Sequence, residues 1–166
     1  VNYSFGGLHT VLQKAFSQFN IKKRALKNVL ILGFGGGSVA SILQEEYGKD
    51  LEMVAVERDE VVIELAEKYF SIDKYKKLAL HCSDAYDYIL NSQPKEFDLI
   101  VVDIFVDLLV PEKFQDEKFI SAISNNLSSD GIVFYNFIAR DEKTRDAGGK
   151  LYKRMASLIG DTEWVR

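Results

Sequence analysis

The chain has 166 residues, 47% of them hydrophobic and 28% charged, with a formal net charge of −4. This composition is typical of one globular domain with a sizeable core, and the acidic balance argues against a general affinity for nucleic acid. No apolar run approaches the roughly 20 residues that span a bilayer, and no signal peptide opens the chain, so we expect a cytoplasmic protein without a membrane segment. Cys82 has no disulfide partner, and His9 and His81 lack metal-ligand spacing, so we expect no metal site.

The first 27 residues form a predicted helical lead-in. Apolar residues recur on one helical face from Leu8 to Phe19, and the basic residues 22–24 follow directly. Cations are common at helix C-termini, and a small anion site is the less common explanation of this cluster. Because the chain begins with Val1 rather than Met, we expect it to be part of a longer protein.

Predicted strands and helices alternate through the rest of the chain. The strands are expected at Val29–Leu32, Leu51–Val56, Leu78–Cys82, Phe97–Val102 and Ile132–Ile138, with the start of a sixth at Thr162–Arg166. The helices are expected at Val39–Tyr47, Asp59–Phe70, Ala85–Leu90 (stopping before Pro94), Glu117–Leu127 and Leu151–Ile159, the last of them preceded by a polar loop over Arg140–Gly149. This alternation predicts a single α/β domain over residues 1–166, with a Rossmann-like, doubly wound, mainly parallel sheet in a three-layer α/β/α arrangement.

A glycine-rich stretch follows the first predicted strand. Val29–Leu32 is apolar on both faces, as is typical of a central parallel strand buried under helices. The glycines over 33–37 then allow a sharp turn and a close approach of the backbone to a ligand. A helix that begins there would direct free N–H groups at that ligand. A glycine-rich turn without a ligand is the alternative.

Carboxylates follow the next three predicted strands. Glu57 ends the second, Asp84 follows the third and Asp103 follows the fourth. Ligands of such sheets bind at the carboxyl ends of the strands, and an acidic residue about 20 positions after a glycine loop is placed to bind ribose hydroxyls. Each carboxylate alone could instead cap a helix or lie in a loop, an alternative that is strongest for Asp84 because a short helix follows it.

Two nucleotide-binding motifs compete for the glycine loop. Residues 35–40 fit the G-x-G-x-x-A fingerprint of dinucleotide-binding proteins. Gly33-Phe34-Gly35-Gly36-Gly37 instead resembles the G-x-G-x-G loop of class I S-adenosylmethionine-dependent methyltransferases. The motifs Cys82-Ser83-Asp84-Ala85, Phe97–Asp103 and Ser129–Val133 follow in the order found in that superfamily, which favours the second reading.

Within that superfamily the chain resembles the spermidine-synthase-like branch. Val54–Val62 followed by Lys68-Tyr69-Phe70, and then Asp84–Ile89, carry the resemblance, which extends over about Asn28–Ile138. It implies S-adenosylmethionine as the cofactor, with the glycine loop at its methionine moiety, Glu57 at the ribose, Asp84 and Ala85 at the adenine, and Asp103 at the reacting centre. The implied cofactor-binding residues are Gly33, Phe34, Gly35, Gly37, Glu57, Arg58, Asp84, Ala85 and Asp103.

The chain also departs from the synthase pattern. Gly36 stands where the synthases carry an Asp, and Val106 and Asp107 stand where their second loop carries Asp and Pro. A diamine needs carboxylates to bind its cations, so these changes favour methyl transfer over aminopropyl transfer. Asp103 is the candidate catalytic residue, as a general base or as the group that orients an amine or hydroxyl.

The sequence thus predicts a methyltransferase that converts S-adenosylmethionine to S-adenosylhomocysteine. A small-molecule acceptor is expected, its identity is open, and a homodimer is open as well. Phe105, Tyr135 and Phe137 either bound the acceptor pocket or pack in the core. An aminopropyltransferase and a non-catalytic interaction domain of the same fold are the alternatives.

Overall fold

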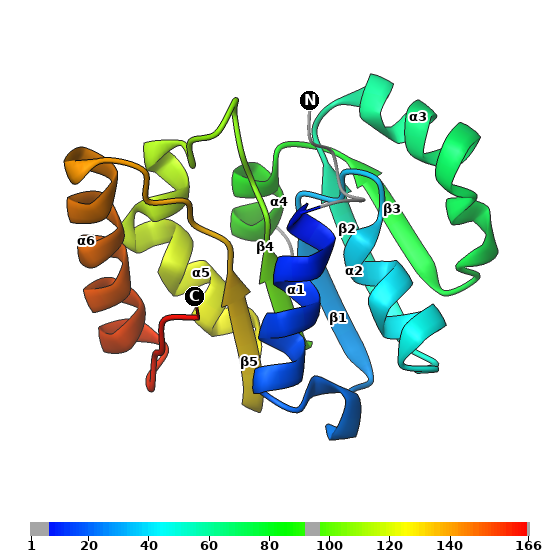
Figure 1. Cartoon of the computed structure of the whole chain (residues 1–166), viewed down its shortest axis with the longest axis horizontal. Helices are drawn as coiled ribbons and strands as arrows, with labels where there is room; N and C mark the ends of the chain where they lie inside the picture. Colours follow the sequence, from blue (N-terminus) through cyan, green and yellow to red (C-terminus); the bar gives the residue numbers. More distant parts are fainter. Residues whose placement is uncertain (1–6, 92–96, 166) are drawn as a thin grey trace.

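A computed structural model describes residues 7–91 and 97–165 of the chain (Figure 1). Within them, one sheet contains the strands β1 (Asn28–Leu32), β2 (Glu52–Glu57), β3 (Leu78–Cys82), β4 (Phe97–Val102) and β5 (Leu127–Tyr135). The strand order is β3-β2-β1-β4-β5, and every neighbouring pair is parallel. The order therefore reverses between β1 and β4. This confirms the predicted doubly wound α/β sheet and places its switch point beside the glycine loop.

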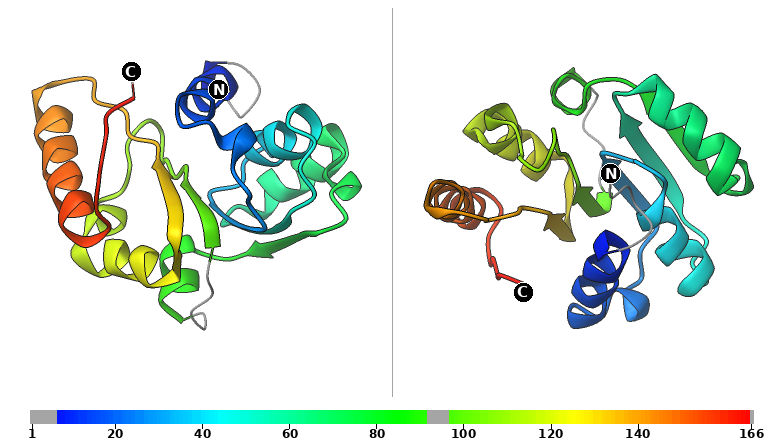
Figure 2. Two further views of the ribbon diagram at one scale, coloured as in Figure 1. Left: turned by 90° about the horizontal axis from the view of Figure 1, so that it is seen from below. Right: turned by 45° about the horizontal axis from the view of Figure 1, so that its top comes forward.

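Helices cover both faces of the sheet (Figures 1 and 2). One face carries α1 (Gly7–Gln18), α2 (Ser38–Ser41) with its π-helical continuation η2 (Ile42–Glu46), and α3 (Glu60–Phe70); the other carries α4 (Ala85–Asn91), α5 (Glu117–Asn126) and α6 (Glu142–Leu158). Val29 and Ile31 pack in the first layer, whereas Leu30 and Leu32 pack in the second. A strand buried on both faces explains why the β1 sequence shows no polar alternation.

Helix α1 packs against strand β5. Leu12 and Phe16 are buried, and the Phe16 ring meets Phe134 edge-on with the centroids 4.9 Å apart. Val11, expected on the buried face, is instead 51% exposed because it lines the open cleft at the edge of the sheet. Residues 1–6 of the predicted lead-in and the side chain of Leu8 lie outside the described residues.

The last helix begins nine residues earlier than the sequence predicts. α6 starts at Glu142 rather than at Leu151, so the predicted loop over Arg140–Gly149 is wrong for most of its length. Asp141 and Thr144 form a reciprocal capping box, which satisfies the free N–H groups of the first turn. Gly148 is needed inside the helix because a Cβ there would lie 3.0 Å from the Phe137 ring. Gly148 therefore marks a close contact of the helix, whereas a Cβ on Gly149 would meet nothing within 4 Å.

Strand β5 begins earlier and ends earlier than expected. Its pairing with β4 moves from Phe97 opposite Leu127 to Leu99 opposite Ile132, so residues 128–131, expected to lie between a helix and a strand, form a bulge within β5. The strand ends at Tyr135 rather than at Ile138.

The sixth strand expected from Thr162 is absent from the described residues, which run to position 165. The Tyr152 hydroxyl donates to the Thr162 carbonyl at 2.7 Å, and the Trp164 ring stacks on Tyr152. These contacts hold the segment against α6 and not in the sheet. Pro94, the predicted stop of the α4 region, and Arg166 lie outside the described residues.

Candidate functional site

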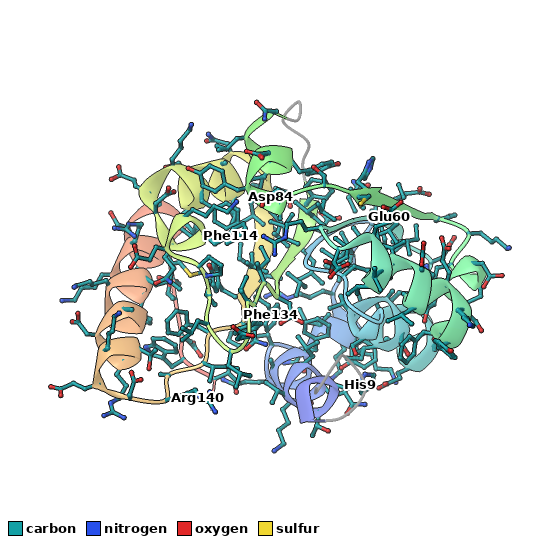
Figure 3. All side chains as sticks on the ribbon, turned by 90° about the horizontal axis from the view of Figure 1, so that it is seen from above. His9, Glu60, Asp84, Phe114, Phe134 and Arg140 are labelled. Carbon is teal, nitrogen blue, oxygen red and sulfur yellow. The ribbon has the colours of Figure 1, made fainter. Side chains whose placement is uncertain are left out.

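A large open cleft lies at the carboxyl edge of the sheet, where ligands of doubly wound folds bind. Its volume is about 1960 Å³, and it extends from the glycine loop over β4 and β5 towards α1 and α6. Figure 3 views this edge from above. The predicted site residues that line the cleft are Gly33, Gly35, Glu57, Arg58, Asp84, Ala85 and Asp103. Residues from the ends of four different strands therefore meet in one place, as the sequence predicts.

The glycine loop packs directly on the backbone that follows β4. Gly33 has φ +90°, and a Cβ on it would lie 2.2 Å from the Asp103 carbonyl oxygen. Gly33 N–H also donates to the Val56 carbonyl at 2.9 Å. A side chain at this position would displace the backbone of a neighbouring strand end, so the glycine has a structural reason apart from any ligand.

Two of the predicted cofactor-binding residues belong to the glycine loop but do not line the cleft. The Phe34 side chain is buried in the hydrophobic layer under α1 and α2. Gly37 has φ +86°, and a Cβ there would lie 3.0 Å from the Phe34 ring. The two residues shape the turn, with Gly37 N–H donating to the Phe34 carbonyl at 3.0 Å. They would contribute to ligand binding only indirectly, by setting the position of the loop.

Glu57 ties the glycine loop to the end of β2. Its Oε2 accepts a hydrogen bond from Gly35 N–H at 3.0 Å, and its Oε1 accepts from the N–H groups of Arg58 and Asp59 at 2.8 and 3.1 Å. A carboxylate has about four acceptor positions, so one remains for a ligand hydroxyl. The Arg58 side chain is exposed. Sequence reasoning expected a ribose ligand for Glu57 and missed its three backbone partners.

Asp84 lines the cleft and also caps α4, the alternative that the sequence left open for it. Its Oδ1 accepts from Tyr86 N–H at 2.9 Å, as a cap of α4 does, while its Oδ2 pairs with Lys113 Nζ at 2.7 Å. Burial acts to raise the pKa of Asp84, but the Lys113 ammonium and the backbone donors outweigh it and hold the pKa below its ordinary value. Lys113 comes from the 3₁₀-helix η4 (Glu112–Gln115), and sequence reasoning did not identify it.

Asp103 lies at the switch point, directly after β4. Asn136 Nδ2 donates to Asp103 Oδ1 at 2.9 Å. Burial raises the pKa of Asp103 to about 6, against the Asn136 hydrogen bond and with a smaller contribution from the Glu57 charge. A carboxylate with this pKa changes its protonation close to neutral pH, which suits a group that takes up a proton. Asn136 was missed because its proximity follows from the pairing of β4 with β5.

The segment after Asp103 projects an apolar turn at the mouth of the cleft. Val106 and Leu109 exchange two backbone hydrogen bonds, of 2.9 and 3.1 Å, and Asp107 between them has φ +58°. Val106, Leu108 and Leu109 are exposed. Phe105, Tyr135 and Phe137 line the cleft but also pack on the second hydrophobic layer, and the Tyr135 hydroxyl donates to the Phe114 carbonyl at 2.8 Å.

Residues 7–91 and 97–165 contain neither a metal-ligand cluster nor a membrane-spanning helix. No group of three or more His, Cys, Asp or Glu side chains in this part of the chain could hold a metal ion. No helix in the same part is long and apolar enough to cross a membrane.

The chain matches one protein family and is similar in sequence to two named relatives. A sequence model of the spermine/spermidine synthase domain matches residues 15–139. The chain is 36% identical over 112 residues to a polyamine aminopropyltransferase of Vibrio vulnificus, which covers 66% of this chain and 37% of that protein. It is 27% identical over 128 residues to the eEF1A lysine and N-terminal methyltransferase of Mus musculus, which covers 72% of this chain and 18% of that protein. The chain therefore spans less than two fifths of either relative.

Among solved structures, human Methyltransferase-like protein 13 in complex with SAH (S-adenosylhomocysteine) has a TM-score of 0.72 to this chain. The sequence identity is 22%, and the match covers 92% of this chain and 72% of that chain. At this level of identity the likeness shows the fold, and it agrees with the parallel sheet and its helical layers described above.

Proposed function

Because this chain belongs to the spermine/spermidine synthase domain family, we propose that it binds S-adenosylmethionine at the carboxyl edge of its sheet and catalyses methyl transfer to an amine. The observation that carries the proposal is the half-buried Asp103 carboxyl beside the glycine loop at the switch point, with a pKa raised to about 6. The relatives support an amine acceptor, since one is named for polyamines and the other for lysine and N-terminal groups.

The residues of the cleft fit such a cofactor. Gly33 and Gly35 leave the border of the loop without side chains, so that the methionine moiety can approach the backbone closely. Glu57 keeps an acceptor position for a ribose hydroxyl, and Asp84 with Ala85 forms the wall proposed for adenine. When bound, S-adenosylmethionine supplies a methyl group that its sulfonium already activates.

The chain itself contributes alignment and a proton acceptor. Asn136 fixes one oxygen of the Asp103 carboxyl, which leaves the other to accept a hydrogen bond from an acceptor amine. Holding the two reactants in line is the larger part of the catalysis of such a transfer. Above a pH of about 6 Asp103 is ionised and can take up the proton that the amine loses.

Aminopropyl transfer is the second candidate, and the 36% identity to the Vibrio vulnificus enzyme favours it. It would use decarboxylated S-adenosylmethionine, whose bare cationic amine needs a carboxylate nearby. Gly36 and Val106, which stand at the positions of two synthase carboxylates, supply none. We therefore expect S-adenosylmethionine to bind more tightly than its decarboxylated form, by about 1–3 kcal/mol.

The test is a pair of titrations followed by a transfer assay. Calorimetry would compare the two ligands, and the assay would offer each donor with diamines and with lysine-containing peptides, so that small and polypeptide acceptors are both covered. Methylated amine from S-adenosylmethionine is the expected product. Tighter binding of the decarboxylated donor, with aminopropylation of a diamine, would show the second candidate to be correct. If neither ligand binds, the cofactor proposal is wrong.

We also propose a cytoplasmic location. Cys82 is the single cysteine of this chain and carries an exposed thiol, which agrees with a reducing compartment.

A further inference from the structure

Lys113 lies in η4, between β4 and α5, and contacts Asp84, which belongs to the wall proposed for adenine. Its Nζ lies 2.7 Å from Asp84 Oδ2, and it also lies over the rings of Tyr86 and Phe114, at 5.5 and 4.9 Å from their centroids. Figure 3 shows Asp84 and Phe114 near each other on this side of the cleft. The ammonium is therefore held by one carboxylate and by the faces of two aromatic rings.

The backbone that carries Lys113 is held by four contacts. Phe114 is 3% exposed and packs edge-on against Phe119, with the ring centroids 5.2 Å apart. The Phe114 carbonyl accepts from the Tyr135 hydroxyl at 2.8 Å. The Gln115 amide donates to the Val110 carbonyl at 2.7 Å, and the Gln115 carbonyl accepts from the Arg154 guanidinium. Lys113 is thus presented from a packed element and not from a freely moving loop.

The two oxygens of Asp84 are consequently fixed in place. Tyr86 N–H holds Oδ1 and Lys113 holds Oδ2, so the carboxylate cannot rotate without breaking one of these bonds. An ionised carboxylate only accepts hydrogen bonds. It therefore attracts the 6-amino group of adenine and repels the 6-oxo group of hypoxanthine or guanine.

We propose that Lys113 is a positioning residue that makes the site selective for adenine over 6-oxopurines by holding the Asp84 carboxylate in its accepting orientation. The inference rests on the proposed binding of an S-adenosyl ligand at this edge of the sheet. It assigns a role in base recognition to a residue of the segment between β4 and α5.

The experiment compares S-adenosylhomocysteine with its 6-oxo analogue S-inosylhomocysteine by calorimetry. The unaltered chain should prefer the adenosyl ligand. Lys113→Met should weaken binding of that ligand about tenfold and leave the inosyl ligand unchanged, whereas Lys113→Arg should restore most of the preference. Lys118→Met, which removes an exposed lysine of α5, is the matched control and should change neither affinity.

A double-variant cycle separates this role from a merely structural one. In an Asp84→Asn background, Lys113→Met should have no further effect on the preference, because Lys113 acts through Asp84. Equal loss of both ligands, or an adenosyl preference that survives Lys113→Met, would overturn the inference and leave the proposed function intact. Failure of the unaltered chain to bind either ligand would overturn the proposed function and this inference with it. If Lys113→Met does not fold, the Asp84→Asn and Lys113→Arg proteins carry the same comparison.

Discussion

The Asp103 carbonyl oxygen occupies the space that a side chain on Gly33 would need, with a Cβ there only 2.2 Å away. The glycine loop after β1 and the candidate catalytic residue after β4 are therefore in direct contact. Because Gly33 also has φ +90°, two independent constraints exclude larger residues. The position of Asp103 depends on Gly33, so the loop and the reacting centre should respond together to mutation.

Gly33→Ala tests this contact. The substitution should lower the free energy of unfolding by at least about 2 kcal/mol, from the strained φ and the displaced backbone, and should weaken ligand binding. Urea denaturation gives the first quantity and calorimetry the second. Gly149→Ala is the control, because a Cβ there meets nothing within 4 Å and the residue lies inside α6. It should be neutral or slightly stabilising. Equal stabilities of the two variants would contradict the proposed constraint.

Asp103→Asn should remove activity and increase stability. Burial disfavours the ionised form of Asp103 and raises its pKa from 3.8 to about 6. The folded state therefore holds the proton more tightly than the unfolded state. Above pH 6 the ionised carboxyl lowers the free energy of unfolding, and below pH 3.8, where both states are protonated, this effect disappears. At neutral pH the variant should be more stable by up to about 3 kcal/mol, with transfer slowed at least about 100-fold. Melting curves at neutral and acidic pH provide the check, since the gain should vanish in acid.

Asn136 should tune the pH dependence of the reaction. With Asp103 as the proton acceptor, the transfer rate should fall as the pH drops below about 6. Asn136→Ala removes a hydrogen bond that lowers the Asp103 pKa, so this fall should begin about one pH unit higher. Rate profiles of the variant and of Asn125→Ala, an exposed residue of α5, can be compared. Coinciding profiles for all three proteins would remove Asp103 from the proton transfer.

Glu57→Ala should affect both binding and folding. The carboxylate accepts three backbone N–H groups, so its loss leaves the N–H of Gly35 without this partner and should cost about 1–3 kcal/mol of stability. Binding of the adenosyl ligand should weaken by about 1.5–3 kcal/mol. Glu60→Ala, at the exposed start of α3, serves as the comparison in both assays. Ligand affinity that matches the unaltered chain would place Glu57 outside the binding site.

Short segments of the sequence were sufficient to predict the central strands of this fold and the polar residues at their ends. The apolar run of β1, the glycines after it and the carboxylates at the ends of β2, β3 and β4 all follow from short segments read alone. Parallel strands align their carboxyl ends, so residues just after each strand had to converge at one edge. For this reason Gly33, Glu57, Asp84 and Asp103 were identified together without knowledge of their contacts.

The partners of those residues required the tertiary structure. Lys113 is 29 positions from Asp84, and Asn136 is 33 positions from Asp103. The first contact depends on how η4 packs beside α4, and the second depends on the register of β5 after its bulge. The place of Gly148 inside α6 likewise reflects a tertiary contact, because a Cβ there would lie 3.0 Å from the Phe137 ring. Each of these contacts joins elements whose relative placement is set by packing in the core, and no local sequence pattern encodes that placement.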